Sequence, residues 1–179
     1  MKKIMFNSKY GLEQAVLEGR KTMTRRIIHD DVVEIYSDPW DLIGNCARYH
    51  FDEVVAVVQR YCDVLHCADV PKGGEKGWGN KMFVKADLMP HHIKITDIKV
   101  ERLQDISDDD CLREGIKQIK SEDVPQITEA GVIYYTFEGV TGIWTTPRAA
   151  FAALIDKVSG KGTWNSNPWV FVYEFKLID

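Results

Sequence analysis

The chain has 179 residues, of which 45% are hydrophobic and 28% charged, and its formal net charge is −4. This length suits one domain with a sizeable core, so we expect residues 1–179 to form a single domain. Phosphate contacts dominate non-specific nucleic-acid affinity. The acidic balance therefore argues against a protein that coats DNA or RNA and leaves only a local basic patch for such contact.

The lengths of the apolar runs and the spacing of the cysteines predict the cellular compartment of the protein. No apolar run approaches the roughly 20 residues of a membrane-spanning helix. Polar residues at positions 7–9 end the first apolar stretch before a signal sequence forms. The four cysteines are scattered, which fits reduced thiols. We expect a cytoplasmic protein with no membrane partner.

Two groups of side chains could be taken for metal sites. Cys62, His66 and Cys67 lie within six residues, but a closed zinc site needs four ligands and no second pair follows at a matching spacing. The acidic residues 108–110 equally suit the positive end of a helix. We therefore expect half-buried thiols and a helix start at these places, with no metal and no cofactor.

The first half of the chain predicts one helix among short strands. The helix covers residues 9–18, is capped by Asn7 or Ser8 and ends at Gly19. Four glycines between positions 71 and 80 predict a flexible loop. Strands are predicted over residues 2–6, 32–36, 53–59 and 81–86.

The second half predicts three strands and two well-marked helix starts. Residues 92–103 alternate as one long strand with a slip that indicates a bulge. Ser107 caps a helix, and Thr146-Pro147 opens another that Gly160 ends. The further strands are expected over residues 132–137 and 169–178, after a polar loop over 120–131. Many strands without a strand–helix rhythm favour an α+β barrel with a mixed or antiparallel sheet and helices packed outside.

Three stretches carry a family resemblance. Residues 18–26 match the helix-end pattern x-G-x-K-T-x-T-x-R, and residues 95–115 and 162–175 match later segments in the same order. Together they resemble the ASCH family of the PUA-like superfamily, in its longer phage and gut-bacterial form. The resemblance implies a PUA-like mixed β-barrel with peripheral helices, a cleft beside the pattern, and RNA as a partner. Residues 30–80 match poorly and are expected to contain an insertion.

An enzymatic branch of that family implies a catalytic set. Small bacterial members remove the acetyl group of N(4)-acetylcytidine with a Lys, a Thr and a Glu, which correspond here to Lys21, Thr24 and Glu114. A Thr hydroxyl is a weak nucleophile unless a base takes its proton. Lys acts as that base only where burial or a neighbouring cation lowers its pKa. Nearby cations are Arg20, Arg25 and Arg26.

The same segment also suits a binding protein. An aromatic such as Trp78, Trp164 or Trp169 can stack on an unpaired base. Trp169 begins the last strand and is expected to pack in the core, and Trp78 in the glycine-rich loop is the better exposed candidate. The residues expected to contact RNA are Arg20, Lys21, Thr22, Arg25, Arg26, Trp78 and Lys81. His91 and His92 are expected to be surface residues.

Three interpretations stay open on the sequence alone. The leading one is an RNA- or nucleotide-binding domain with its basic cleft at residues 19–26, and the alternative is an amidohydrolase that deacylates a modified cytidine. The third is a phage-encoded interaction protein whose cleft is vestigial, in which the basic residues are a solvated charged face, since surfaces are commonly charged. The distance between Lys21 and Glu114 would separate them, because a shared pocket favours chemistry and an open groove favours binding.

Overall fold

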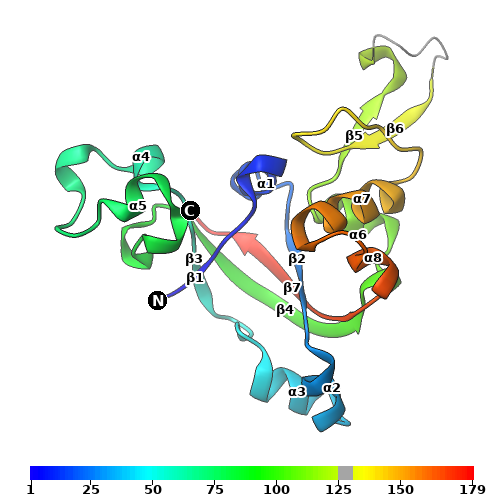
Figure 1. The fold of residues 1–179 in the computed structure, drawn as a ribbon, viewed down its shortest axis with the longest axis horizontal. Helices are drawn as coiled ribbons and strands as arrows, with labels where there is room; N and C mark the ends of the chain where they lie inside the picture. The colour runs from blue at the N-terminus through cyan, green and yellow to red at the C-terminus, as the bar shows by residue number, and fades with distance from the viewer. Residues whose placement is uncertain (125–130) are drawn as a thin grey trace.

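The centre of the fold is a five-stranded sheet in the order β1-β3-β4-β7-β2 (Figure 1). The computed structural model describes residues 1–124 and 131–179. Strands β1 and β3 are parallel and the other neighbours antiparallel, so the sheet is mixed. Its strands are β1 (Lys2–Ile4), β2 (Met23–Ile27), β3 (Val54–Val57), β4 (His92–Arg102) and β7 (Trp169–Leu177). The predicted α+β class is confirmed.

A two-stranded hairpin and short helices complete the described chain. Figure 1 shows α6, α7 and α8 gathered at one end of the sheet and α4 and α5 at the other. The hairpin pairs β5 (Lys117–Lys120) with β6 (Ile133–Thr136). The helices are α1 (Leu12–Leu17), α2 (Asp30–Ile35), α3 (Pro39–Cys46), α4 (Tyr61–Val64), α5 (Lys76–Gly79), α6 (Asp108–Arg113), α7 (Pro147–Ser159) and α8 (Thr163–Ser166). The 3-10 turns are Ser8–Tyr10, Cys67–Asp69, Lys81–Phe83, Ala86–Leu88, Leu103–Asp105 and Ser121–Asp123.

Several predicted local features are confirmed. The Ser107 hydroxyl accepts a hydrogen bond from the Asp110 N–H at 3.1 Å, and the Thr146 hydroxyl caps α7 in the same way. Gly19, with φ of +71°, turns the chain out of α1. The register of β4 against β7 shifts between Ile95 and Asp97, which is the predicted bulge. Local sequence signals thus placed the elements that surround the site.

Two predicted strands are wrong. Residues 32–36 lie mostly in α2, where Asp30 and Asp31 occupy the first turn, a place that favours carboxylates. The run 81–86 forms 3-10 turns, because the Asn80 side chain accepts from the Met82 N–H and closes a turn there. The glycine-rich stretch 71–80 contains the short helix α5. Apolar runs of five or six residues fit either a strand or a helical turn, so the periodicity of these runs did not separate the two.

The core has two parts of unequal size. The larger part packs the sheet against α7, with Ile95, Tyr173 and Phe151 among its members. The smaller part belongs to the segment between β3 and β4, and its members are Ala56, Val58, Tyr61, Val84 and Met89. The stretch 30–80 therefore contributes the inner strand β3 as well as the helices on either side of it.

Two further expectations concern the closure of the sheet into a barrel and the polar loop over residues 120–131. Strands β1 and β2 occupy the two edges of the sheet, so among the described residues no ladder closes it, and the barrel stays a prediction. In the predicted loop 120–131, residues 125–130 lie outside the described chain. Within the part that the structure describes, every helix is too short or too polar to cross a membrane.

Candidate functional site

A cavity of about 220 Å³ lies beside the residues that carry the sequence pattern. Its polar groups come from the segment after β1, from the start of β2 and from the end of α6, and α7 supplies an apolar wall. The lining residues are Met5, Phe6, Asn7, Leu12, Lys21, Thr24, Arg25, Arg26, Ile27, Glu114, Phe151, Leu154, Ile155, Val158 and Ser159. An apolar cavity with a few convergent polar groups is the usual form of a small-molecule site.

Backbone geometry brings Lys21 and Glu114 together from distant parts of the chain. After Gly19 the Lys21 N–H donates to the Ala15 carbonyl at 2.8 Å, which holds this residue against the end of α1. Glu114 closes α6, and Gly115 follows it with φ of +107°. A Cβ on Gly115 would lie 3.1 Å from the Leu12 side chain, so glycine allows α6 to end against α1.

The Lys21 ammonium is buried with Glu114, and its side chain is only 2% exposed. Its Nζ lies 2.5 Å from Glu114 Oε2, 2.8 Å from the Glu114 carbonyl and 2.7 Å from the Met23 carbonyl. The three donors of an ammonium therefore have three acceptors. The Phe6 ring lies 5.8 Å from the same nitrogen. Lys21 belongs to the interior of the site and not to a solvated surface.

Arg25 binds the other oxygen of the Glu114 carboxylate. Its Nη1 donates to Glu114 Oε1 at 3.1 Å, and its Nη2 donates to Glu101 at 2.6 Å and to Asp110 at 3.1 Å. The guanidinium is 1% exposed, and its charge is matched by these carboxylates. We therefore assign Arg25 to holding Glu114 in place, where the sequence predicted contact with RNA.

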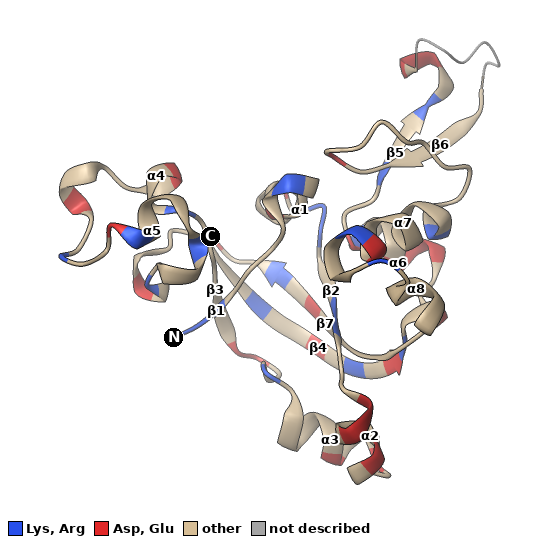
Figure 2. Cartoon of the chain, viewed as in Figure 1, with Lys and Arg blue, Asp and Glu red and all other residues tan. Residues whose placement is uncertain are grey.

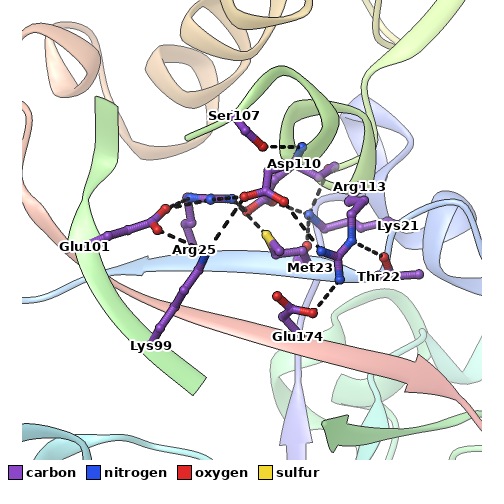
Figure 3. Close-up of polar contacts among 11 residues, drawn as sticks. Lys21, Thr22, Met23, Arg25, Lys99, Glu101, Ser107, Asp110, Arg113 and Glu174 are labelled. Carbon is purple, nitrogen blue, oxygen red and sulfur yellow. Dashed lines mark hydrogen bonds and ion pairs between the residues drawn. The ribbon is translucent and has the colours of Figure 1, made fainter. Parts of the chain in front are cut away.

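Arg113 extends this polar network toward β7. Its Nη2 donates to Glu174 at 2.6 Å, and its Nε donates to the Thr22 hydroxyl at 3.2 Å (Figure 3). The Lys99 ammonium lies 3.2 Å from Glu101, the carboxylate that also binds Arg25. A buried ionic group is costly unless it is fully paired, so this network holds the site rigid by satisfying its own members.

Burial shifts the pKa of Lys21, which lines the cavity, and of Cys111 in α6. Burial lowers the pKa of Lys21, and the neighbouring Glu114 carboxylate opposes that shift. The positive charges of Arg26 and Arg25 lower the pKa of Lys21 further. Burial also raises the pKa of the Cys111 thiol to about 12, which keeps it protonated. A lysine with a lowered pKa is the kind of group that proton-transfer catalysis uses.

Thr24 and Asn7 offer unused polar groups to the cavity. Thr24 is buried and lines the cavity, and its hydroxyl bonds to no side chain or carbonyl in the described ranges 1–124 and 131–179. The Asn7 oxygen accepts from the Lys9 N–H at 3.0 Å, which orients the amide and leaves its NH₂ for a ligand. The sequence predicted Asn7 only as a helix cap, and nothing in the local pattern reveals that it lines the cavity.

The other residues of the predicted RNA set are dispersed. Arg20 pairs with Glu18 at 2.6 Å, and Thr22 accepts from Arg113. Arg26 is exposed and lines the cavity, with its Nη2 donating to the Met5 carbonyl at 2.8 Å. Residues 19–26 therefore face both inward and outward and do not form one continuous basic patch.

The glycine-rich segment does not add to the cavity lining. Trp78 is 37% exposed, and neither it nor Lys81 lines the cavity. Lys81 donates to the Phe6 carbonyl at 3.2 Å and pairs with Glu13 and Ser8. These bonds use the Lys81 ammonium to fasten the segment onto the chain that precedes α1.

The remaining aromatic and histidine candidates have structural partners. Trp164 packs edge-on against Phe151, and the Arg102 guanidinium covers Trp169 at 4.4 Å. His92 Nδ1 lies 2.6 Å from Asp179, and His91 Nδ1 lies 3.2 Å from the Asp179 carbonyl. None of these four side chains lines the cavity.

The cysteines and acidic residues that resemble metal ligands in the sequence are either exposed or bound to an arginine. Cys62 and Cys67 are exposed free thiols, and Asp110 binds Arg25. A search of the described residues found no cluster of three or more His, Cys, Asp or Glu side chains suited to a metal ion.

Comparison of the chain with family models, with curated proteins and with solved structures found no match in any of the three. Lys21, Thr24 and Glu114 all line this cavity, and Lys21 binds Glu114 directly. The Lys21–Glu114 ion pair is buried, and the Thr24 hydroxyl belongs to the same largely apolar cavity.

Proposed function

We propose that the protein is an amidohydrolase of the ASCH type, with a PUA-like barrel, that removes an acyl group from the exocyclic nitrogen of a cytidine-like base. The observation that supports this is the Lys21–Glu114 pair, with Nζ 2.5 Å from Oε2, in the cavity that Thr24 also lines. An enclosed pair of this kind suits proton transfer to a small ligand better than the gripping of an RNA backbone.

Lys21 acts as the base in this proposal. The neutral amine has two N–H donors and one lone pair, so it can serve two of its three acceptors and turn the lone pair toward Thr24. The Thr24 oxygen bonds to the acyl carbon, and its proton passes to Lys21. When the bond from that carbon to the exocyclic nitrogen breaks, Lys21 returns the proton to the leaving amine.

A water molecule completes the cycle. Water attacks the acyl-threonine ester and gives one proton to Lys21, which passes it to the departing Thr24 oxygen, and the acid is released. Glu114 and Arg25 position Lys21 throughout, since Arg25 holds one oxygen of Glu114 and Lys21 the other. The Asn7 amide and the Arg26 guanidinium, both in the lining, are the donors available to the developing oxyanion.

The remainder of the cavity fits a flat ring. Phe6 and the α7 residues Phe151, Leu154 and Ile155 provide apolar surface, and the polar groups lie on the side of β2. At about 220 Å³ the cavity is smaller than the roughly 300–1,000 Å³ that drug-sized ligands occupy. A single base with a short acyl group is a ligand of suitable size.

The test is hydrolysis of N(4)-acetylcytidine by the purified chain, followed by chromatography of the products. Thr24→Val removes the hydroxyl at nearly constant volume and is expected to lower kcat by at least about 100-fold. Thr24→Ser keeps a hydroxyl and is expected to retain activity. Folding of each variant is checked by thermal melting. Turnover of the folded wild-type chain no faster than in buffer would remove the proposal.

Binding of RNA or a nucleotide without chemistry is the second candidate. It is favoured by Arg26, which is exposed beside the cavity and bonds only to a backbone carbonyl among the described residues. This alternative predicts binding of short single-stranded RNA that weakens with salt and weakens again in Arg26→Ala. Fluorescence anisotropy with labelled RNA measures it, and binding without turnover would replace the first proposal with the second.

A further inference from the structure

A second cavity, of about 360 Å³, lies on the other side of Arg26. Met5, Arg26 and Ile27 line both cavities and so form a shared wall between them. The hydrogen bond from Arg26 to the Met5 carbonyl ties this wall together. The second cavity is lined by Lys3, Met5, Arg26, Ile27, Cys46, Arg48, Tyr49, Phe171 and Tyr173.

The lining of this second cavity is cationic without a matching carboxylate. Lys3 donates to the Met82 and Val84 carbonyls, Arg26 to the Met5 carbonyl, and the Arg48 guanidinium lies 5.8 Å from the Tyr49 ring. None of the three cations forms an ion pair with a carboxylate in the described part of the chain. The first cavity differs, because its buried cations Lys21 and Arg25 are paired with acids.

The charged residues of this lining, Lys3, Arg26 and Arg48, are all basic, although the chain as a whole is acidic. The chain carries a net charge of −4, and acidic residues colour α2 in Figure 2 while basic residues colour β1 and β2. Glu53, whose charge acts on Tyr49, is itself bound by Lys2 at 3.1 Å. A positive cavity on an acidic protein attracts an anion locally.

Two tyrosines hold the cationic residues in position. The Tyr49 hydroxyl donates to the Lys3 carbonyl at 3.0 Å, and the Tyr173 oxygen accepts from the Arg48 N–H at 3.0 Å. The two rings pack edge to face at 5.2 Å. Burial raises the pKa of both phenols, so both stay neutral hydrogen-bonding groups at pH 7. Lys3 and Arg48 are therefore held by hydrogen bonds to tyrosines that line the same cavity.

We propose that this second cavity binds a phosphate group of the ligand whose base occupies the first cavity. The preferred ligand is then a nucleotide, and a free nucleoside binds more weakly. Arg48 and Arg26 can grip phosphate oxygens with their planar donors, and Lys3 adds a point charge. Arg26 lines both cavities. A ligand with its base in the first cavity and its phosphate in the second therefore contacts Arg26 with both groups. This inference rests on the function proposed above.

The experiment measures binding of cytidine and of cytidine 5′-monophosphate to the full chain by calorimetry at low salt. We expect the nucleotide to bind at least about 10-fold more tightly, since charge-assisted hydrogen bonds are the strong ones. Arg48→Gln is expected to reduce that preference below about 3-fold and to leave cytidine binding unchanged, whereas Arg48→Lys keeps the charge and part of the preference. Arg60→Gln removes an exposed charge that lines neither cavity and should change nothing.

Two further arms separate this inference from the proposed function. Equal affinity for cytidine and its monophosphate overturns the phosphate site, even where N(4)-acetylcytidine is hydrolysed. If neither cytidine compound binds, pyrophosphate decides: saturable binding that Arg48→Gln abolishes supports the anion site and counts against the base site, and no binding overturns both. A short oligocytidylate that binds more tightly than the monophosphate assigns the site to an internal phosphate of RNA.

Discussion

At the level of single residues, neighbouring basic side chains lie in different environments, some buried and one exposed. Lys21 and Arg25 lie inside and share the two oxygens of Glu114, whereas Arg26, one residue further along β2, is exposed. A pattern that looks uniformly basic in sequence therefore separates into two buried cations that bind Glu114 and one exposed cation. Only Arg26 of these three is available to an anionic group of a ligand.

The charge of Lys21 is predicted to depend on Glu114. Burial lowers the pKa of Lys21 in the folded chain, and Glu114→Gln removes the carboxylate that opposes this shift. Between the lowered folded pKa and the unfolded value of about 10.4, the unfolded state binds more protons, so stability rises with pH in that window. Urea denaturation at pH 6 to 9.5 should show a steeper rise for Glu114→Gln than for wild type.

Glu174→Gln is the matched control for that experiment. Glu174 belongs to the same network but binds Arg113, at 2.6 Å, and does not contact Lys21. Its removal is expected to lower stability without changing the slope against pH. Equal slopes for Glu114→Gln and wild type would show that Glu114 does not control the protonation of Lys21.

The four cysteines are predicted to differ sharply in reactivity. The thiolate is the reactive form, and burial raises the pKa of Cys111 to about 12, whereas Cys62 and Cys67 are exposed. Iodoacetamide at pH 8 should label the two exposed cysteines within minutes and leave Cys111 unmodified, as peptide mass spectrometry would show. Labelling of Cys111 in urea is the control, and rapid labelling in the native chain would contradict its burial.

At the scale of elements, the site depends on how α6 ends. Ser107 caps the helix at one end, and Glu114 and Gly115 close it at the other, so one short helix sets the positions of Asp110 and Glu114. The first residue binds Arg25, and the second binds both Arg25 and Lys21. A change in the path of the chain after α6 would therefore reach the base proposed for catalysis.

Gly115→Ala tests this dependence. The residue has φ of +107°, and an added Cβ would lie 3.1 Å from Leu12 and 3.7 Å from the Lys21 side chain. We expect a loss of about 1–3 kcal/mol in the free energy of unfolding, from the backbone strain and the contact together. Urea denaturation measures it.

Gly44→Ala serves as the comparison for that substitution. Gly44 lies in α3, and a Cβ there would meet nothing within 4 Å, so alanine is expected to stabilise the helix by up to about 1 kcal/mol. Opposite signs for the two glycines are thus predicted. Equal small effects would mean that the turn after α6 accommodates a side chain.

At the scale of the whole molecule, the two parts of the core differ in size and are predicted to open separately. The smaller part is centred on Tyr61, whose hydroxyl accepts from the Lys85 N–H at 2.8 Å and whose ring contacts Gly77. Few buried apolar contacts imply a low free energy of local opening. Hydrogen exchange should therefore be faster for amides of residues 58–91 than for those paired between β4 and β7.

Tyr61→Ala sharpens that prediction. The variant removes the central ring of the smaller cluster, so exchange is expected to accelerate throughout residues 58–91 while the β4–β7 amides keep their protection. Phe171→Ala is the reciprocal control, because Phe171 belongs to the larger part of the core. Uniform acceleration in Tyr61→Ala would show that the chain opens as one cooperative unit.

Much of the fold around the site was predictable because its signals are local. The Ser107 and Thr146 caps, the Gly19 turn and the long alternating strand with its bulge are each decided by neighbours in sequence. The strands predicted at 32–36 and 81–86 failed because runs of five or six residues have no distinct period. Two acidic residues in the first turn favour the helix at the first place, and the Asn80 cap closes a turn at the second.

The family resemblance implied Lys21, Thr24 and Glu114 as a catalytic set, and the acidic net charge predicted that any basic patch would be local. Only the tertiary structure decided that Lys21 and Arg25 are paired inside, that Asn7 faces the same cavity, and that Arg48 and Lys3 lie beside Arg26. The physical reason is that local signals act over a few residues. The ion pair between Lys21 and Glu114 instead joins positions 93 residues apart, and packing of the whole chain creates it.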